Sequence, residues 1–93
     1  SFDYGMDART LKTLRIRERL FSEQAKLSMQ QHRIDTTMIS NILYLGDVDF
    51  GKSDQRKKPC GEYYITGTEA LEGIHLLVKR CDSTATIEEI TIH

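Results

Sequence analysis

The spacing of apolar residues changes near residue 47, about midway along the 93-residue chain. Before this point the apolar residues recur at the spacing of amphipathic helices. After it, the apolar Ile74, Leu76 and Val78 alternate with His75, Leu77 and Lys79, which is the period of a β-strand. The pattern therefore predicts two or three helices followed by an antiparallel meander.

The first two helices are expected before residue 34. A first helix is predicted over residues 7–20, whose sparse apolar stripe consists of Leu11, Leu14 and Leu20. The other positions of this segment are rich in Arg and Lys, as in a surface helix that covers a sheet. Ser22 is a suitable N-cap for a second helix, which would bury Ala25.

A third helix is predicted to start near Asp35 or Thr36, because both residues are good N-caps. Its buried face would consist of Met38, Ile39, Ile42 and Leu43. Gly46 follows the last apolar position, and we expect it to end the helix in a left-handed conformation.

Three or four strands are predicted after the helices. Val48 and Phe50 indicate a short edge strand, and further strands are expected at Glu62–Thr66, Ile74–Arg80 and Ala85–His93. The segment between Gly51 and Pro59 contains several basic residues and is expected to be a mobile loop. The adjacent Glu88 and Glu89 interrupt the alternation of the last strand, which indicates a bulge or an exposed edge.

These elements predict a single α+β domain over residues 1–93, in which N-terminal helices pack on a small antiparallel sheet of three to four strands. The opposite face of such a sheet carries polar side chains. A catalytic or binding site is therefore expected on this open face.

Composition agrees with a globular domain, since 39% of the residues are apolar and 29% are charged. No apolar run is long enough to span a bilayer, and the first four residues lack the features of a signal peptide. We therefore expect a cytoplasmic protein without membrane contact. Cys60 and Cys81 would lie near each other in a hairpin, but in the cytoplasm they are expected to be reduced thiols.

The net charge of −1 conceals an asymmetry along the chain. Residues 1–58 contain eleven basic and eight acidic residues, whereas the remainder contains two basic and six acidic residues. The basic half could attract a polyanion, although a solvated amphipathic helix gives the same count.

Several classes of chemistry lack a signature in this sequence. The three histidines, His32, His75 and His93, are far apart and have no metal-ligand spacing. The six glycines are scattered, so no phosphate-binding loop is indicated, and no Ser or Cys lies in a nucleophile elbow. We therefore expect no metal and no cofactor.

General acid–base chemistry on the open face of the sheet remains. Cleavage of RNA needs a base for the 2′-hydroxyl, an acid for the leaving oxygen and a cation for the phosphorane. His75 and His93 lie on neighbouring predicted strands, and Lys52, Lys57 and Lys79 supply positive charge. The alternative for each histidine is a half-exposed residue with no chemical role.

Two short segments resemble bacterial toxin families. The helical half contains Phe21 to Ala25 (FSEQA), Met29 to Ile34 (MQQHRI) and an apolar helix that ends at Gly46. This half resembles a family of small bacterial proteins allied to the BrnT toxins. The segment Asp49 to Ser53 (DFGKS) is similar to a motif of the MqsR toxins. The resemblance implies a RelE-like fold and cleavage of messenger RNA.

The resemblance also implies roles for single residues. Lys52 takes the place of the lysine implicated in RNA cleavage by MqsR toxins, His93 lies near a basic position of the last strand, and His75 lies near a tyrosine position. Gln24 and His32 depart from the allied family, which usually has histidine and arginine there. A glutamine cannot transfer a proton at neutral pH, so these departures are expected in an inactive chain or in one with another base.

The expected function is therefore the toxin of a toxin–antitoxin pair, a metal-independent endoribonuclease that acts on mRNA. The expected catalytic residues are Lys52, His75 and His93, and the expected RNA-binding residues are Lys57, Lys58, Tyr64, Lys79 and Thr91. The expected partners are RNA and a cognate antitoxin, and the expected state is a monomer or weak dimer. The alternative is a non-catalytic protein-binding module on the same fold. DNA binding is less favoured, because the helices lack a helix-turn-helix turn.

Overall fold

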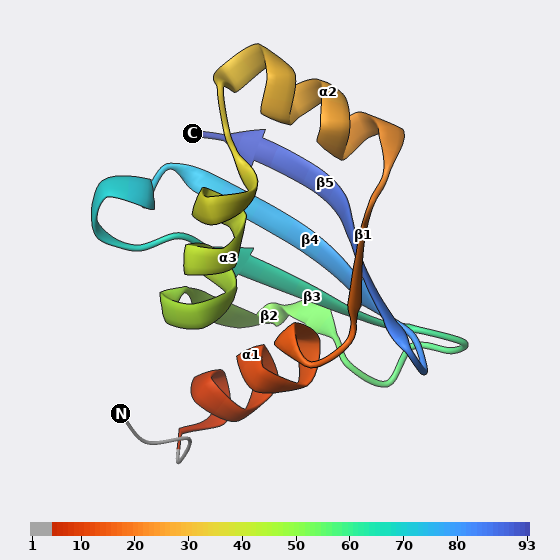
Figure 1. Ribbon diagram of the computed structural model, residues 1–93. Coiled ribbons are helices and arrows are strands. Elements are labelled where there is room, and N and C mark those ends of the chain that lie inside the picture. The colour runs from red at the N-terminus through yellow and green to blue at the C-terminus, as the bar shows by residue number, and fades with distance from the viewer. Residues whose placement is uncertain (1–4) are drawn as a thin grey trace.

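A computed structural model describes residues 5–93, in which three α-helices lie on one face of a five-stranded sheet (Figure 1). The helices are α1 (Met6–Arg15), α2 (Glu23–His32) and α3 (Thr36–Leu45), and a short 3-10 helix, η1, spans Glu69–Leu71. The strands are β1 (Glu18–Phe21), β2 (Asp47–Asp54), β3 (Gly61–Thr66), β4 (Ile74–Arg80) and β5 (Thr84–Ile92). The predicted α+β class is confirmed.

The strands follow the order β1-β5-β4-β3-β2. Strands β2 to β5 form the expected antiparallel meander, whereas β1 pairs in parallel with β5. The prediction of a purely antiparallel sheet with three to four strands is therefore wrong. The additional strand comes from a segment that the sequence assigned to a helix.

The first helix ends at Arg15 and not at residue 20 as predicted. The side chain of Arg17 donates from Nε to the carbonyl oxygens of Cys81 and Asp82, at 2.9 and 3.1 Å, and so ties this segment to the β4–β5 turn. Leu20 consequently lies in β1 and is 41% exposed, so it does not continue the apolar stripe of α1. Tertiary pairing with a distant strand here prevails over local helical preference.

The starts of α2 and α3 are confirmed. The Ser22 hydroxyl accepts from the amide of Ala25 at 3.1 Å, and the Asp35 carboxylate accepts from the amide of Met38 at 2.9 Å. Gly46 ends α3 as predicted, but its φ of −73° is not left-handed. A glycine is needed there because a Cβ would lie 2.5 Å from the carbonyl oxygen of Ile42.

Strands β3, β4 and β5 agree closely with their predicted positions, and the pairing of β4 with β5 shifts register at the expected bulge near Glu88 and Glu89. Strand β2 is longer than expected, because Gly51 to Asp54 continue the strand and do not belong to the loop. The core lies between the sheet and the helices. Its largest fully buried side chains are Leu11, Leu14, Ile39, Ile42, Leu43, Ile65, Leu76, Val78, Ile87 and Ile90.

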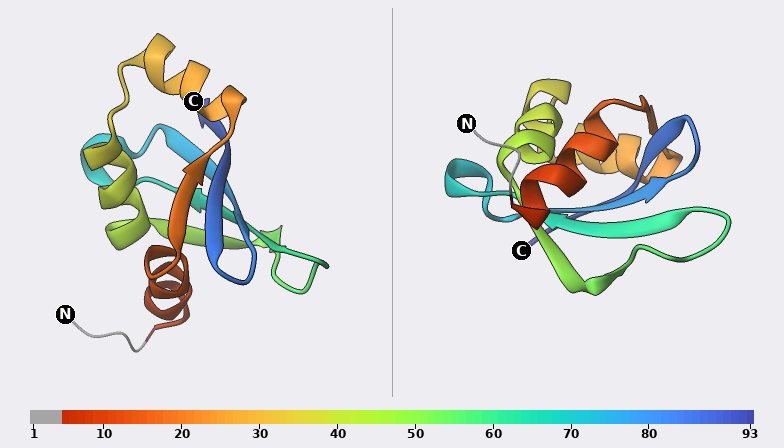
Figure 2. Two further views of the ribbon diagram at one scale, coloured as in Figure 1. Left: turned by 45° about the vertical axis from the view of Figure 1, so that its right-hand side comes forward. Right: turned by 90° about the horizontal axis from the view of Figure 1, so that it is seen from below.

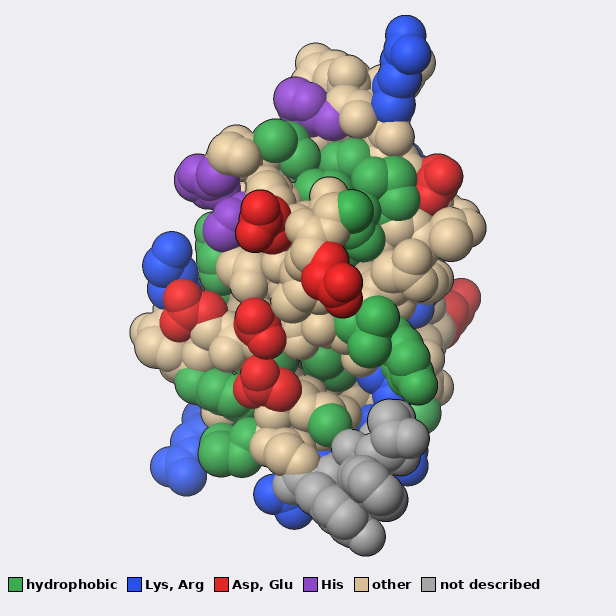
Figure 3. Space-filling view, turned by 90° about the vertical axis from the view of Figure 1, so that its left-hand side faces the viewer, with side chains coloured by type: hydrophobic (Ala, Val, Ile, Leu, Met, Phe, Trp, Pro, Cys, Tyr) green, Lys and Arg blue, Asp and Glu red, His purple; other side chains and the backbone are tan. Residues whose placement is uncertain are grey.

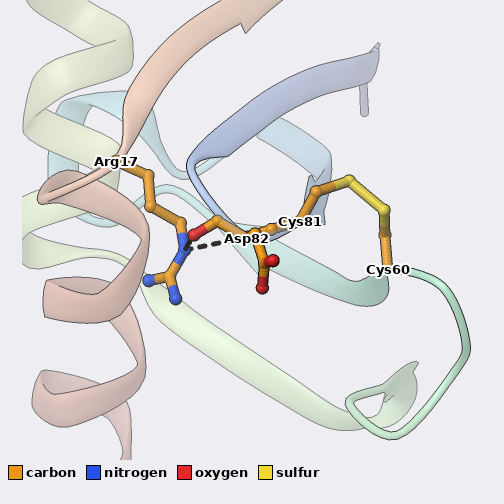
Figure 4. Close-up of a disulfide and its surroundings, with 4 residues drawn as sticks. All are labelled: Arg17, Cys60, Cys81 and Asp82. Atoms are coloured by element: carbon orange, nitrogen blue, oxygen red, sulfur yellow. Dashed lines mark hydrogen bonds between the residues drawn. A yellow bond between two sulfur atoms is a disulfide. The ribbon is translucent and has the colours of Figure 1, made fainter.

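A disulfide joins Cys60 and Cys81, which corrects the prediction of reduced thiols (Figure 4). Gly61 and Arg80 are the register pair at one end of the β3–β4 ladder. Cys60 precedes Gly61 and Cys81 follows Arg80, so the two cysteines lie next to this end, opposite each other. Their Cα atoms are 4.6 Å apart, the separation of directly opposite residues in an antiparallel pair, so a bridge needs no movement of the backbone. The hairpin model placed the cysteines correctly, and only the assumption of a reducing compartment led to free thiols.

The three α-helices lie on one face of the sheet, and no helix of residues 5–93 lies on the other, toward which the second half of β2 and the loop after it bend (Figure 2). Buried positions of β3, β4 and β5 point toward the helices, and the alternate positions point away from them. None of the described helices has both the length and the apolar character needed to cross a membrane.

Candidate active site

The open face of the sheet carries polar side chains from all three central strands. On β4 these are His75 and Lys79, which alternate with the buried Leu76 and Val78. The register places His75 between Thr66 of β3 and Thr91 of β5. The predicted position of a polar face is therefore confirmed.

Four of the predicted site residues lie close together at one end of this face. The Tyr64 hydroxyl is 3.3 Å from Nδ1 of His75, and the ring of His93 meets that of His75 edge-on with the centroids 4.3 Å apart. The Nζ atom of Lys52 lies 4.6 Å from the centroid of the Tyr64 ring. We call Lys52, Tyr64, His75 and His93 the imidazole cluster.

A bulge in β2 brings Lys52 to this cluster. The pairing of β2 with β3 shifts register between Asp49 and Asp54. The Asp49 carboxylate accepts from the amide of Lys52 at 3.1 Å, and the Ser53 hydroxyl donates to the carbonyl oxygen of Asp49 at 2.7 Å. The same hydroxyl accepts from the amide of Tyr64 at 2.9 Å and thus replaces a missing ladder bond.

Asp49 and Ser53 are therefore positioning residues, which the sequence did not single out. Their only signal is the DFGKS segment itself, in which an acid precedes the lysine by three positions and a serine follows it. Side chains of this kind commonly bond to nearby backbone groups at turns and bulges.

The pKa of His75 is lowered from the usual value of 6.5. Partial burial is the main cause, and the nearby charges of His93 and Lys52 add to it. The His75 ring is therefore largely neutral at pH 7. When its proton is on Nδ1 and is donated to the Tyr64 oxygen, Nε2 keeps a lone pair and can accept a proton.

The remaining predicted lysines lie at the opposite end of the open face. Lys57, Lys58 and Lys79 line a hollow of about 90 Å³ beside Cys60 and Glu62. Lys79 follows His75 by four positions on β4, a distance of about 13 Å along the strand. We call this region the lysine end.

Lys57 is already paired there. Its Nζ atom donates to the Glu62 carboxylate at 2.9 Å, and this bond and the carboxylate charge raise the pKa of Lys57. Among residues 5–93, no hydrogen bond or ion pair engages the side chain of Lys58 or Lys79. Lys58 and Lys79 can therefore bind a phosphate without first breaking a contact, whereas Lys57 cannot.

Gln24, which stands where the allied family usually has histidine, does not lie on the open face. Its Oε1 accepts from the amide of Ile90 at 3.1 Å, and its Nε2 lies 3.2 Å from the Ser28 hydroxyl. The hydroxyl of Ser28 in turn donates to the carbonyl oxygen of Ile90 at 3.1 Å. Beyond the end of β1, side chains of α2 therefore hydrogen-bond to backbone groups of β5 that no strand pairs. Gln24 consequently has a structural role.

His32 lies in the last turn of α2 and contacts none of the imidazole cluster. Thr91 lies beside His75 but is exposed and makes no hydrogen bond through its side chain to the described residues. Within residues 5–93 no three His, Cys, Asp or Glu side chains come close enough to hold a metal ion.

A protein-family model matches most of the chain. The model of Domain of unknown function (DUF4258) matches residues 21–92. The chain belongs to the DUF4258 family. The match begins at the end of β1 and includes every residue of the imidazole cluster except His93, the residue that follows the matched segment. No curated protein and no solved structure matches this DUF4258 chain significantly.

Proposed function

We propose that this DUF4258 protein is the toxin of a bacterial toxin–antitoxin pair and cleaves messenger RNA without a metal ion. The observation that carries the proposal is the imidazole cluster, in which two imidazoles, a phenol and an ammonium group lie together on the open face. The resemblance of the DFGKS segment to MqsR toxins supports it. Kinship with the RelE fold belongs to the same proposal and is supported by helices on one face of the sheet and a polar opposite face.

In the proposed reaction, Nε2 of neutral His75 takes the proton of a ribose 2′-hydroxyl. The 2′-oxygen attacks the adjacent phosphorus, and the bond from phosphorus to the 5′-oxygen breaks. His93, as the imidazolium, donates a proton to that leaving oxygen. The products are a 2′,3′-cyclic phosphate and a 5′-hydroxyl end. Lys52 stabilises the negative charge that develops on the phosphorane.

The lysine end binds the RNA backbone in this proposal. Lys58 and Lys79 contact phosphates about two nucleotides from the cleaved bond, since about 13 Å separates Lys79 from His75 along β4. Lys57 joins them only if its bond to Glu62 opens. Tyr64 and Thr91 lie nearer the cleaved bond, where the Tyr64 ring could stack on a base.

The proposal places the protein in the cytoplasm, where mRNA is found. Reductants of that compartment act on Cys60 and Cys81. The six register pairs of the β3–β4 ladder, Gly61 with Arg80 to Thr66 with His75, are independent of the disulfide. The imidazole cluster is therefore preserved when the bridge is reduced.

A ribonuclease assay in EDTA tests the function. The wild-type chain should cleave a single-stranded RNA and leave cyclic phosphate ends, and the double variant Lys52→Ala, His93→Ala should lose at least about 100-fold in rate. The matched control is Lys26→Ala, His32→Ala, which removes the same residue types from α2. Full activity of the first double variant, or loss of activity in EDTA, would reject the proposal.

The second candidate function is a non-catalytic protein-binding module, favoured by the net charge of −1, which is unusual for a protein that holds RNA. Expression in a bacterial host separates the two functions. Growth arrest that the product of a neighbouring gene relieves supports the toxin and its antitoxin. Normal growth at high expression supports the module.

A further inference from the structure

A hollow of about 350 Å³ lies between α3 and the β3–β4 connection, away from the open face. Figure 3 views this side of the molecule, where apolar and acidic side chains are interspersed and most Lys and Arg side chains lie toward the margins. Its apolar walls include Met38, Leu45 and Leu71, and Leu45 is 57% exposed. We call this hollow the α3 groove.

Glu69 is the one charged residue among the described residues that line the α3 groove, and Glu72 follows it by three positions. Segments 35–50 and 66–73 contain five acidic residues and not one Lys or Arg. The acids are Asp35, Asp47, Asp49, Glu69 and Glu72, but Asp47 and Asp49 alternate with the buried Val48 and point away from the helices, so Glu69 and Glu72 are the two acids of the groove wall. Arg15 and Arg19 do reach α3, where Arg15 donates to the carbonyl oxygen of Leu43 and lies over the Tyr44 ring, and Arg19 donates to the Ser40 hydroxyl. None of these three α3 residues lines the groove. The formal charge of the groove wall is therefore negative.

The β3–β4 connection, which forms one wall of the α3 groove, is held in place by a hydrogen bond and by close packing. The Thr68 hydroxyl donates to the carbonyl oxygen of Leu45 at 3.2 Å and so ties the wall to the end of α3. A Cβ at Gly67 would lie 2.1 Å from the carbonyl oxygen of Leu71, which shows how tightly this loop closes. Glu69 lines the groove with a φ of 55°, a left-handed conformation that costs free energy in a residue other than glycine.

We propose that the α3 groove binds a basic amphipathic segment of a partner protein. Apolar side chains of that segment occupy the groove against Leu45, and flanking Lys or Arg side chains meet Glu69 and Glu72. The carboxylates of Glu69 and Glu72 disfavour a polyanion such as RNA as the occupant. The inference goes beyond the proposed cleavage of RNA and does not depend on it.

Fluorescence anisotropy with a labelled peptide tests this proposal. The probe is an amphipathic peptide of about 14 residues, enough for about four helical turns, made of Leu and Lys, and its counterpart has Glu in place of Lys. The Lys peptide should bind at least about tenfold more tightly than the Glu peptide, and its affinity should fall with added salt.

Variants locate the binding. Leu45→Lys should weaken binding of the Lys peptide by about tenfold or more, and Glu69→Gln with Glu72→Gln should weaken it by about threefold to tenfold. Leu27→Lys is the matched control, because Leu27 is 56% exposed but lies on α2. Circular dichroism and the melting temperature establish that each variant is folded.

Three results would overturn the proposal. One is equal binding of the two peptides, and another is an equal loss of affinity in the Leu27→Lys and Leu45→Lys variants. The third is a dimer of the wild-type chain, seen by sedimentation, that Leu45→Lys dissociates, because this result assigns the groove to a second copy. None of these measurements involves RNA, so cleavage activity and peptide binding fail or succeed separately.

Discussion

The two ends of the open face use their cationic side chains differently. In the imidazole cluster, His75 has a 3.3 Å contact with a phenol and an edge contact with a second imidazole, and no carboxylate of residues 5–93 pairs with it. At the lysine end, Lys57 is paired with Glu62, and a disulfide fixes the strands beside it. Groups of the first kind can change protonation, whereas groups of the second kind keep their charge and position.

One end of the open face is thus suited to proton transfer and the other to binding of phosphate. The lowered pKa of His75 favours its neutral form near pH 7, whereas Lys57 is an ammonium at this pH with or without the rise in its pKa. Substitutions at one end should therefore change the rate of cleavage, and substitutions at the other should change affinity or stability. Four experiments test this division.

The largest effect is expected from His75→Ala. Removal of the proposed base should lower kcat for RNA cleavage by about 10² to 10⁴. The free energy of unfolding should change by less than about 1 kcal/mol, because the side chain is only partly buried. Single-turnover kinetics and urea denaturation measure the two quantities, and an unchanged kcat would remove His75 from the mechanism.

Removal of the disulfide should lower stability and leave the cleavage rate nearly unchanged, which is the opposite of the effect of His75→Ala. The bridge closes a loop between residues 21 positions apart, so Cys60→Ser with Cys81→Ser should lower the free energy of unfolding by about 3 kcal/mol. The cleavage rate should change by less than about twofold, because sites more than ~10 Å apart act independently. Wild-type protein treated with dithiothreitol is the control and should lose the same stability.

Lys79→Ala should weaken RNA binding without a change in chemistry. Loss of one phosphate contact should raise KM by about threefold to tenfold at unchanged kcat, and it should reduce the slope of log affinity against log salt by about 0.7 for a single strand. Lys26→Ala, on α2, should change neither quantity. A fall in kcat instead of a rise in KM would place Lys79 in the catalytic step.

The smallest effect concerns the pKa of His75. His93→Gln removes one of the charges that lower it, so the pKa should rise toward 6.5, as followed by the ring protons in an NMR titration. In the wild type, the folded chain binds this proton more weakly than the unfolded chain. The contribution of His75 to stability is therefore full above about pH 6.5 and falls as the pH drops below it. A fall in the pKa after His93→Gln would contradict the electrostatic account.

The sequence predicts the central part of the molecule well. Alternation identified β3 and β4 and placed His75 on the open face, because each strand is buried on one side only. Ser22 and Asp35 predicted the starts of α2 and α3 through local side-chain chemistry. Lys52 and His93 were expected near His75, and the structure brings them there.

The features that were missed depend on contacts between distant residues. Strand β1 exists because residues 18–21 find β5, and a four-residue strand has too little pattern to be recognised alone. The structural role of Gln24 likewise depends on the backbone of Ile90, 66 positions away. The lysine end was expected to lie with the histidines, but four positions along β4 place Lys79 about 13 Å from His75, a separation that the predicted strand already implied.

The parallel pairing of β1 with β5 has a consequence for synthesis of the chain. A ribosome releases β1 early, yet its partner strand follows more than sixty positions later, as does the Ile90 backbone that Gln24 engages. Closure of so long a loop is entropically costly and tends to slow folding. Until β5 emerges, the side chains of α2 and β4 that pack against it lack their cover, so the nascent chain should depend on chaperones more than a simple meander of equal length would.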